Sequence, residues 1–210
     1  VIDEAQDYNM LQFIVLKELT GCRSYTIVGD SNQRLVKAEE VPAMLRLKDI
    51  FGGFFNLYQL NKSYRSTYQI MEYANKFLEE DIVVPFVRKG EFNVLETTVP
   101  KGDTEDLIEV IVNLLEDYQE EKYENVAIIT KDKEEVNIIS PELKKRTNIL
   151  SFNKSDIVYR GGRVLVPSYY AKGLEFDAVI LVDFDENTDN LIKYIMSTRA
   201  LHRLSVVKIR

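Results

Sequence analysis

Short runs of β-branched and other apolar residues alternate along the chain with longer stretches in which apolar residues recur every three or four positions. The short runs predict strands, and the longer stretches predict amphipathic helices. Because the two kinds of segment alternate, the pattern predicts an α/β fold with a mostly parallel sheet flanked by helices. Predicted strands span residues 1–2, 25–28, 54–58, 93–97, 126–130, 148–152, 163–166, 178–182 and 205–209, and predicted helices span residues 9–19, 42–50, 67–79, 105–119, 133–145 and 189–201.

Local signals predict where some of these elements begin and end. Ser66, with Gln69 three positions later, is typical of a capping box and predicts a helix start. Pro141 is predicted to end or kink its helix, because proline cannot donate a backbone hydrogen bond. The chain is predicted to divide near residues 58–61, into a short front part over 1–58 and a longer α/β unit over 59–210.

The composition excludes several classes of protein. Of 210 residues, 45% are hydrophobic and 29% are charged, as in ordinary soluble globular proteins, and no apolar run approaches the ~20 residues of a membrane span. The chain does not begin with a charged and then apolar signal segment, so we expect a cytoplasmic protein. Cys22 is the only cysteine and His202 the only histidine, which excludes internal disulfides and metal sites built from cysteine or histidine clusters.

The charge balance and the first residue add two further expectations. Lys and Arg number 27 against 34 for Asp and Glu, and the net charge of −7 argues against indiscriminate coating of nucleic acid. A local basic groove remains compatible with that balance. The chain starts with Val1, inside an apolar run, rather than with methionine. We therefore expect a piece of a longer polypeptide, in which any shared site is incomplete.

Two polar turns follow predicted strands in the front part of the chain. Asp3 and Glu4 come directly after the first strand, where a carboxylate can hold Mg²⁺ and a neighbouring one can orient an attacking water. The turn at residues 29–33, Gly-Asp-Ser-Asn-Gln, follows the second strand, and Gln33 carries an amide that can contact a phosphate oxygen. Parallel strands would bring Asp3 and Asp30 to the same carboxyl edge. The alternative for each is a turn or helix cap without chemistry.

Three further features lie in the rear part of the chain. Arg65 precedes a predicted helix start and can reach an anion, although a surface arginine is the alternative. In the turn at residues 171–177, Gly173 permits a tight bend, and Lys172 and Glu175 can meet a phosphate and sugar hydroxyls; solvated turn charges are the alternative. Arg199 lies among apolar residues of the last predicted helix and needs an anionic partner, either a phosphate or a structural carboxylate.

Taken in order, these features resemble the later motifs of UvrD/Rep/PcrA-like superfamily 1 DNA helicases. They are an acidic strand end, a Gly-Asp-x-x-Gln turn, a Tyr-Arg-Ser helix start, a Lys-Gly-Leu-Glu-Phe turn and a Thr-Arg-Ala helix. The resemblance implies an ATP-dependent enzyme with two RecA-like domains that clamp ATP and Mg²⁺. Residues 1–58 would be the tail of the first such domain, and residues 59–210 would form the second.

The resemblance also implies roles by position. Asp3 would bind Mg²⁺, Glu4 would activate the attacking water, and Gln33 would sense the γ-phosphate. Arg65 and Arg199 would be arginine fingers, which stabilise charge that develops on the transferred phosphate. The other implied nucleotide-binding residues are Tyr64, Lys172, Gly173 and Glu175, of which Glu175 would contact the sugar.

Three departures from the family pattern change this expectation. The phosphate loop, Gly-x-x-x-x-Gly-Lys-Thr, does not occur in the chain. Arg34, Leu35 and Val36 stand after Gln33, where the family commonly has a small residue, Ile and an aromatic, and residues 167–169 (Pro-Ser-Tyr) replace a Thr-x-His. Lys172 follows Arg65 by only 107 positions, so the family's large inserted subdomain is expected to be absent. The last two departures favour the helicase IV/HelD-like branch.

Three functional hypotheses follow from the sequence. The first is the C-terminal part of an ATP-dependent UvrD-like helicase that moves on single-stranded DNA or at a duplex junction, inactive by itself without the phosphate loop. The second is a HelD-like, nucleotide-gated factor that remodels or recycles RNA polymerase. The third is a RecA-like scaffold without hydrolysis, which the combination of Asp3, Glu4, Gln33, Arg65 and Arg199 disfavours. No membrane partner is expected.

Overall fold

The computed structural model of the chain describes residues 1–34, 41–52, 55–60, 62–79, 83–85, 88–151, 159 and 161–210. The chain divides into two compact units, Val1–Leu60 and Asn61–Arg210, and each is described by itself. Residues 55–60 have no regular secondary structure, so the strand predicted over 54–58 is wrong there, and Phe54 lies outside the described residues. None of the helices among the described residues is long and apolar enough to cross a membrane.

In the first unit, the strands predicted over residues 1–2 and 25–28 meet in a parallel bridge between Ile2 and Ile27. The Ile2 N–H donates to the Thr26 carbonyl at 2.9 Å, and the Val28 N–H donates to the Ile2 carbonyl at 2.9 Å. Helix α1 (Met10–Thr20) begins with a capping box formed by Asn9 and Gln12, and α2 (Leu47–Phe51) follows a 3-10 turn. The core of the unit consists of Ala5, Phe13, Ala43, Leu47 and Ile50.

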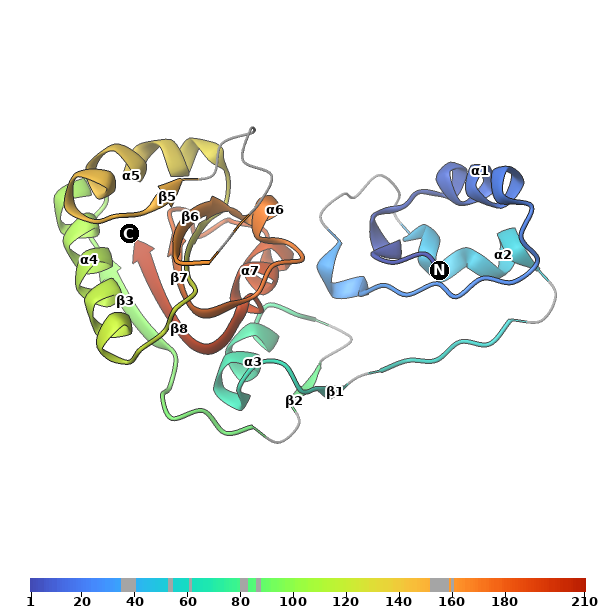
Figure 1. Cartoon of the computed structure of the whole chain (residues 1–210), viewed down its shortest axis with the longest axis horizontal. Coiled ribbons are helices and arrows are strands. Elements are labelled where there is room, and N and C mark those ends of the chain that lie inside the picture. Colours follow the sequence, from blue (N-terminus) through green and yellow to red (C-terminus); the bar gives the residue numbers. More distant parts are fainter. Residues whose placement is uncertain are drawn as a thin grey trace. The chain divides into compact units, whose positions relative to one another are not determined.

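The second unit contains a six-stranded sheet in which all pairs are parallel, with strand order β3-β8-β7-β4-β6-β5 (Figure 1). This confirms the predicted mostly parallel sheet. The strands are β3 (Leu95–Val99), β4 (Val126–Thr130), β5 (Leu150–Ser151), β6 (Arg163–Pro167), β7 (Phe176–Asp183) and β8 (Ala200–Ile209). A separate two-stranded parallel sheet joins β1 (Lys62–Ser63) to β2 (Val84–Pro85).

Helices cover both faces of the six-stranded sheet (Figure 1). One face packs against α4 (Thr104–Glu120) and α5 (Lys133–Arg146), and the other packs against α3 (Tyr68–Asn75), α6 (Ser168–Ala171) and α7 (Asn190–Ser197). Neighbouring residues of one strand therefore enter opposite cores, as Ile128 and Ile129 of β4 do. A strand that is buried on both faces has a continuous run of apolar residues in its sequence, which is why the ranges predicted for β4 and β7 lie close to the observed ones.

Several predicted element ends differ from the structure. Thr67, not Ser66, is the N-cap of α3, and its side chain makes no capping bond, so the capping-box prediction is wrong. Helix α5 continues through Pro141 to Arg146, so this proline does not end the helix. The predicted helix over 189–201 ends at Ser197, because the chain from Ala200 onward pairs with β7 as strand β8. Arg199 consequently lies between α7 and β8, not on a helix.

Candidate functional site

The first group of predicted site residues lies in the turn after Ile2. The Ala5 N–H donates to the Val28 carbonyl at 3.0 Å, which continues the strand pairing into the turn. Asp3 and Glu4 are both exposed, and the Asp3 carboxylate accepts a hydrogen bond from the Glu4 N–H at 2.8 Å. Glu4 has a φ of 52°, a left-handed conformation that is uncommon outside glycine.

A buried amide, Gln6, connects this turn to the second polar turn. Gln6 is 3% exposed; its Nε2 donates to the Glu4 carboxylate at 2.5 Å, and its Oε1 accepts from the Asp30 N–H at 2.9 Å. A Cβ on Gly29 would lie 2.6 Å from the Met44 Sδ and 2.7 Å from that Oε1, so a larger residue would require these two side chains to shift. The sequence does not predict the bridging role of Gln6, because an amide in an acidic turn gives no distinctive sequence signal.

The second polar turn presents Gln33 beside Asp30. The Gln33 Nε2 donates to the Asp30 carboxylate at 2.7 Å, and the other Asp30 oxygen accepts from the Asn32 N–H at 2.9 Å. Hydrogen bonds therefore link Glu4, Gln6, Asp30 and Gln33 in one network at the ends of the two paired strands. The sequence prediction that these two turns meet at one edge is confirmed by the strand bridge and by Gln6.

The donor set of this turn fits a loosely held magnesium ion. Among the described residues no group of three or more His, Cys, Asp or Glu side chains forms a metal cage. Mg²⁺ binds through one or two carboxylates while keeping several waters and substrate phosphate oxygens as its remaining ligands. The exposed carboxylate of Asp3 is a suitable ligand of that kind.

The second group of predicted residues lies in the second unit, at the amino ends of β7 and β8. Arg65 forms an ion pair with Glu175, the residue before β7, and their side chains are 37% and 45% exposed. Tyr64 is 67% exposed, and Lys172 is half-buried. Gly173 has a φ of 78°, a conformation that favours glycine and allows the chain to turn back into β7.

Arg199 is almost completely buried, with 1% of its surface exposed. Its Nε donates to the Ile195 carbonyl at 3.1 Å, its Nη1 to the Leu174 carbonyl at 3.5 Å, and its Nη2 to the Thr198 hydroxyl at 3.3 Å. Backbone carbonyls thus hold the guanidinium against the turn that precedes β7. The structure places this arginine one residue before β8, next to the segment that carries Glu175.

Hydrogen bonds join the three segments that carry these side chains. The Ser66 hydroxyl, which is buried, donates to the Ala200 carbonyl at 2.7 Å. The Phe176 N–H donates to the Arg199 carbonyl at 3.0 Å. Arg65, Glu175 and Arg199, which are far apart in the sequence, therefore lie on backbone segments that are directly connected.

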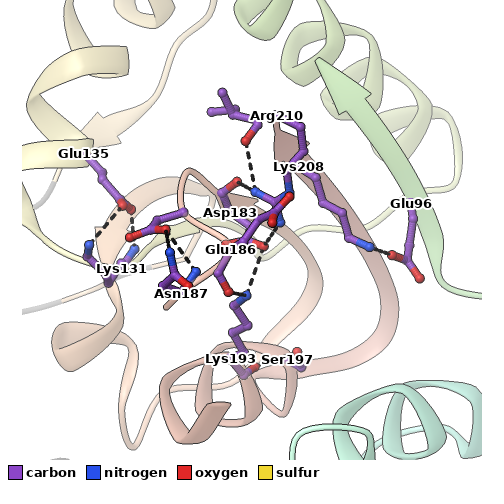
Figure 2. A network of polar contacts seen from close by, with 12 residues as sticks. Glu96, Lys131, Glu135, Asp183, Glu186, Asn187, Lys193, Ser197, Lys208 and Arg210 are labelled. Atoms are coloured by element: carbon purple, nitrogen blue, oxygen red, sulfur yellow. Dashed lines mark hydrogen bonds and ion pairs between the residues drawn. The ribbon is translucent and has the colours of Figure 1, made fainter. Parts of the chain in front are cut away.

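The carboxyl edge of the same sheet carries a different polar cluster, which the sequence did not predict (Figure 2). The Asp183 carboxylate, at the end of β7 and 6% exposed, pairs with Lys193 of α7 at 3.3 Å and with Arg210 at 2.6 Å. Nearby, Lys131 pairs with Glu135 at 3.7 Å. Burial raises the pKa of Glu135. Desolvation alone would lower the pKa of Lys131, but the negative charges of Glu135 and Asp132 outweigh it, so this pKa is raised as well.

Helix α6 presents two tyrosines at this edge. Tyr169 is 45% exposed, and its ring centroid lies 4.7 Å from that of Tyr170 at an interplanar angle of 49°. The preceding Ser168 is buried and donates to the Lys131 carbonyl at 2.7 Å, which fixes the start of the helix. In the other loop that departs from the family pattern, Arg34 is 9% exposed, while Leu35 and Val36 lie outside the described residues.

Comparisons with known proteins identify the family that the chain resembles. Residues 58–159 match the family described as UvrD-like helicase C-terminal domain. A curated protein of Mycoplasma capricolum subsp. capricolum, described as "Probable DNA helicase II homolog", is 32% identical over 84 residues, which are 39% of this chain and 12% of that protein. The chain therefore spans only a small part of this relative's length. The predicted resemblance to UvrD-like helicases is confirmed.

Two solved structures show the same fold. The C-terminal domain of a possible DNA helicase from Lactobacillus plantarum WCFS1 superimposes with a TM-score of 0.58 and 28% identity, over 70% of this chain and 88% of that one. The PRRSV helicase matches with a TM-score of 0.52 and 18% identity, over 98% of this chain and 34% of that one. The predicted RecA-like fold is confirmed by these two likenesses.

Proposed function

We propose that this chain, which carries a UvrD-like helicase C-terminal domain over residues 58–159, is the C-terminal part of an ATP-dependent DNA helicase. Residues 1–58 would be the tail of its first RecA-like domain, and residues 59–210 its second. The observation that carries the proposal is that three segments far apart in the sequence are joined by hydrogen bonds, and each segment carries one residue predicted to bind the nucleotide. Ser66 and Phe176 join the segments of Arg65, Glu175 and Arg199 through direct hydrogen bonds.

The carboxylate turn of the first unit supplies the hydrolytic groups in this proposal. Asp3 holds Mg²⁺, which when bound neutralises phosphate charge and polarises the phosphoryl group. Glu4 orients the attacking water and accepts its proton, while the hydrogen bond from Gln6 fixes the position of the Glu4 carboxylate. Gln33 donates from its amide to a γ-phosphate oxygen.

The second unit supplies the positive charge. Arg65 and Arg199 donate to the oxygens on which charge develops during phosphoryl transfer. Because Arg65 is paired with Glu175, and Arg199 is bonded to backbone carbonyls, both must exchange these partners for phosphate oxygens when ATP binds. Exchange of the Arg65 pair leaves Glu175 able to accept from sugar hydroxyls, with Tyr64, Lys172 and Gly173 around the nucleotide.

The activity of the whole protein is also part of the proposal, because the chain covers only 12% of the curated relative. We propose movement on single-stranded DNA or at a duplex junction, driven by ATP hydrolysis, and a cytoplasmic location, where both ATP and nucleic acid are found. No observation among the described residues favours the alternative action on RNA polymerase, which stays a prediction from the sequence.

The test is Mg²⁺-dependent ATP hydrolysis by the full-length protein with Glu4→Gln. Loss of the general base should lower kcat by about 10²–10⁴-fold, while ATP binding measured by isothermal titration stays near native. The matched control is Glu18→Gln, since Glu18 is an exposed glutamate of the same unit, on α1. Native turnover in Glu4→Gln would contradict the role of this carboxylate, and equal losses in both variants would indicate a general effect of charge removal.

A further inference from the structure

We infer that Ser66 is a positioning residue that holds the backbone of Arg65 to the backbone of Arg199, so that the two guanidinium groups act together on one phosphate. This inference rests on the proposed function and names a residue that the resemblance did not assign. Ser66 is 4% exposed and donates to the Ala200 carbonyl at 2.7 Å, across 134 positions of sequence. Each of the two residues in this contact follows a proposed arginine finger in the sequence: Ser66 follows Arg65, and Ala200 follows Arg199.

The hydroxyl of Ser66 has no role in starting helix α3, which is the usual reason for a serine at such a position. The N-cap of α3 is Thr67, and its side chain makes no capping bond. Gln69, which a capping box would direct back to the helix start, instead pairs with Gly90 through two hydrogen bonds of 2.8 Å. Ser66 therefore uses its one donor for the contact with the β8 segment.

Arg88 makes a second connection between the same two segments. Its Nη2 donates to the Leu201 carbonyl at 2.5 Å and approaches the Arg65 carbonyl at 3.4 Å. The Arg88 carbonyl accepts from the Tyr68 N–H at 2.8 Å, and the Gln69–Gly90 pair holds the chain just beyond it. Unlike Ser66, Arg88 is exposed, so its replacement does not open a cavity.

Together these contacts fix the two arginine segments with respect to each other. The Phe176 N–H, which donates to the Arg199 carbonyl at 3.0 Å, adds the β7 segment to the same assembly. Charge stabilisation in a transition state depends on donors that are already in place, and displacement by about 1 Å can lower the rate by about 10²-fold. A hydroxyl that sets the spacing of two arginines should therefore affect kcat much more than KM.

The experiment measures ATP hydrolysis and ATP binding by the full-length protein with Ser66→Ala and, separately, with Arg88→Ala. We expect Ser66→Ala to lower kcat by about 10-fold, with KM and the ATP dissociation constant within twofold of native, and Arg88→Ala to lower kcat by a smaller factor. The matched control is Ser205→Ala. Ser205 is also a buried serine, 1% exposed, and accepts a 2.7 Å hydrogen bond from the Tyr118 hydroxyl, but it lies further along β8, five positions after Ala200.

The outcomes separate this inference from the proposed function. A fall in kcat for Ser66→Ala, with native kcat for Ser205→Ala and an unchanged KM, supports the inference. Native kcat in Ser66→Ala, while Arg65→Ala loses turnover, overturns the inference and leaves the proposed function standing. Equal losses in the Ser66 and Ser205 variants overturn it as well, because they indicate a general loss of stability. Native turnover in Arg65→Ala and Arg199→Ala removes the proposed function and the inference with it. If Ser66→Ala does not fold, Arg88→Ala decides, and a native kcat there overturns the inference.

Discussion

Replacement of Asp183 by asparagine tests how much the buried ion cluster at the carboxyl edge contributes to the stability of the second unit (Figure 2). The substitution keeps the shape of the side chain and removes its negative charge, which faces Lys193 at 3.3 Å and Arg210 at 2.6 Å. Asp183 is 6% exposed, and the Lys193 side chain is 11% exposed, so solvent cannot replace the lost partner around the lysine.

The expected magnitude follows from which contacts remain. Removal of one partner from a buried ion pair typically costs about 3–5 kcal/mol. Here the cost is reduced, because Lys193 keeps the Glu186 carbonyl at 3.0 Å and the partly exposed Arg210 keeps the Glu186 carboxylate at 2.9 Å. We therefore expect a loss of about 2–3 kcal/mol, which lowers the Tm by roughly 4–12 °C for a unit of this size.

Thermal unfolding of the 210-residue chain, followed by far-ultraviolet circular dichroism, measures this effect. The control is Glu142→Gln, which removes the same charge from an ion pair with Lys145 whose side chains are 50% and 68% exposed. An exposed i,i+3 pair contributes less than about 0.5 kcal/mol, so the control should unfold close to the native chain. A Tm of Asp183→Asn within 1–2 °C of the control, roughly half of the lowest expected shift, would refute the reasoning.

Three further predictions concern the 210-residue chain. It should not hydrolyse ATP, because it lacks a phosphate loop; Mg²⁺-dependent turnover that Glu4→Gln abolishes would contradict this. It should bind single-stranded DNA with a dissociation constant of roughly 10⁻⁵ M or weaker at physiological salt, as judged by fluorescence anisotropy; submicromolar affinity that falls in Tyr169→Ala would instead show a stacking platform. Burial raises the pKa of Glu135 above its usual 4.5, so the stability contributed by the protonated form is present below pH 4.5 and lost as pH rises through the raised pKa. Urea denaturation should therefore give Glu135→Gln a higher free energy of unfolding than the native chain at pH 7, but not at pH 4. An equal or lower free energy of unfolding at pH 7 would contradict the cost of burying the charged carboxylate.

The sequence predicted those parts of the fold that local pattern determines. Strands β4 and β7 are runs of apolar, largely β-branched residues that are buried on both faces of the sheet. Helix α4 buries a single apolar stripe along its length. For these elements the predicted and observed residue ranges nearly coincide. The helix predicted over 189–201 was too long because its apolar spacing continues past its end. Pairing of Ala200 and the residues after it with β7 takes precedence over that local preference.

Sequence motifs predict the polar side chains proposed for the candidate site, but not the residues that support them. Asp3, Glu4, Gln33, Arg65 and Arg199 stand in recognisable motifs, whereas the supporting contacts of Ser66, Arg88 and Gln6 depend on partners that pattern does not reveal. Ser66 bonds to a carbonyl 134 positions away, and Gln6 to an N–H 24 positions away. Such bonds form only once the sheet brings the segments together, so no local sequence signal marks them.

The steady-state turnover of the full-length protein with Arg65→Ala and with Arg199→Ala tests the central claim most directly. Arginine fingers of phosphoryl-transfer enzymes contribute about 10³-fold or more to kcat, and we predict a loss of that size in each variant with a smaller change in KM. The matched control is Arg146→Ala, since Arg146 forms an exposed ion pair with Glu105 and its side chain, 40% exposed, resembles Arg65 in exposure. Near-native turnover in either variant would contradict the claim and would assign that arginine to a structural contact.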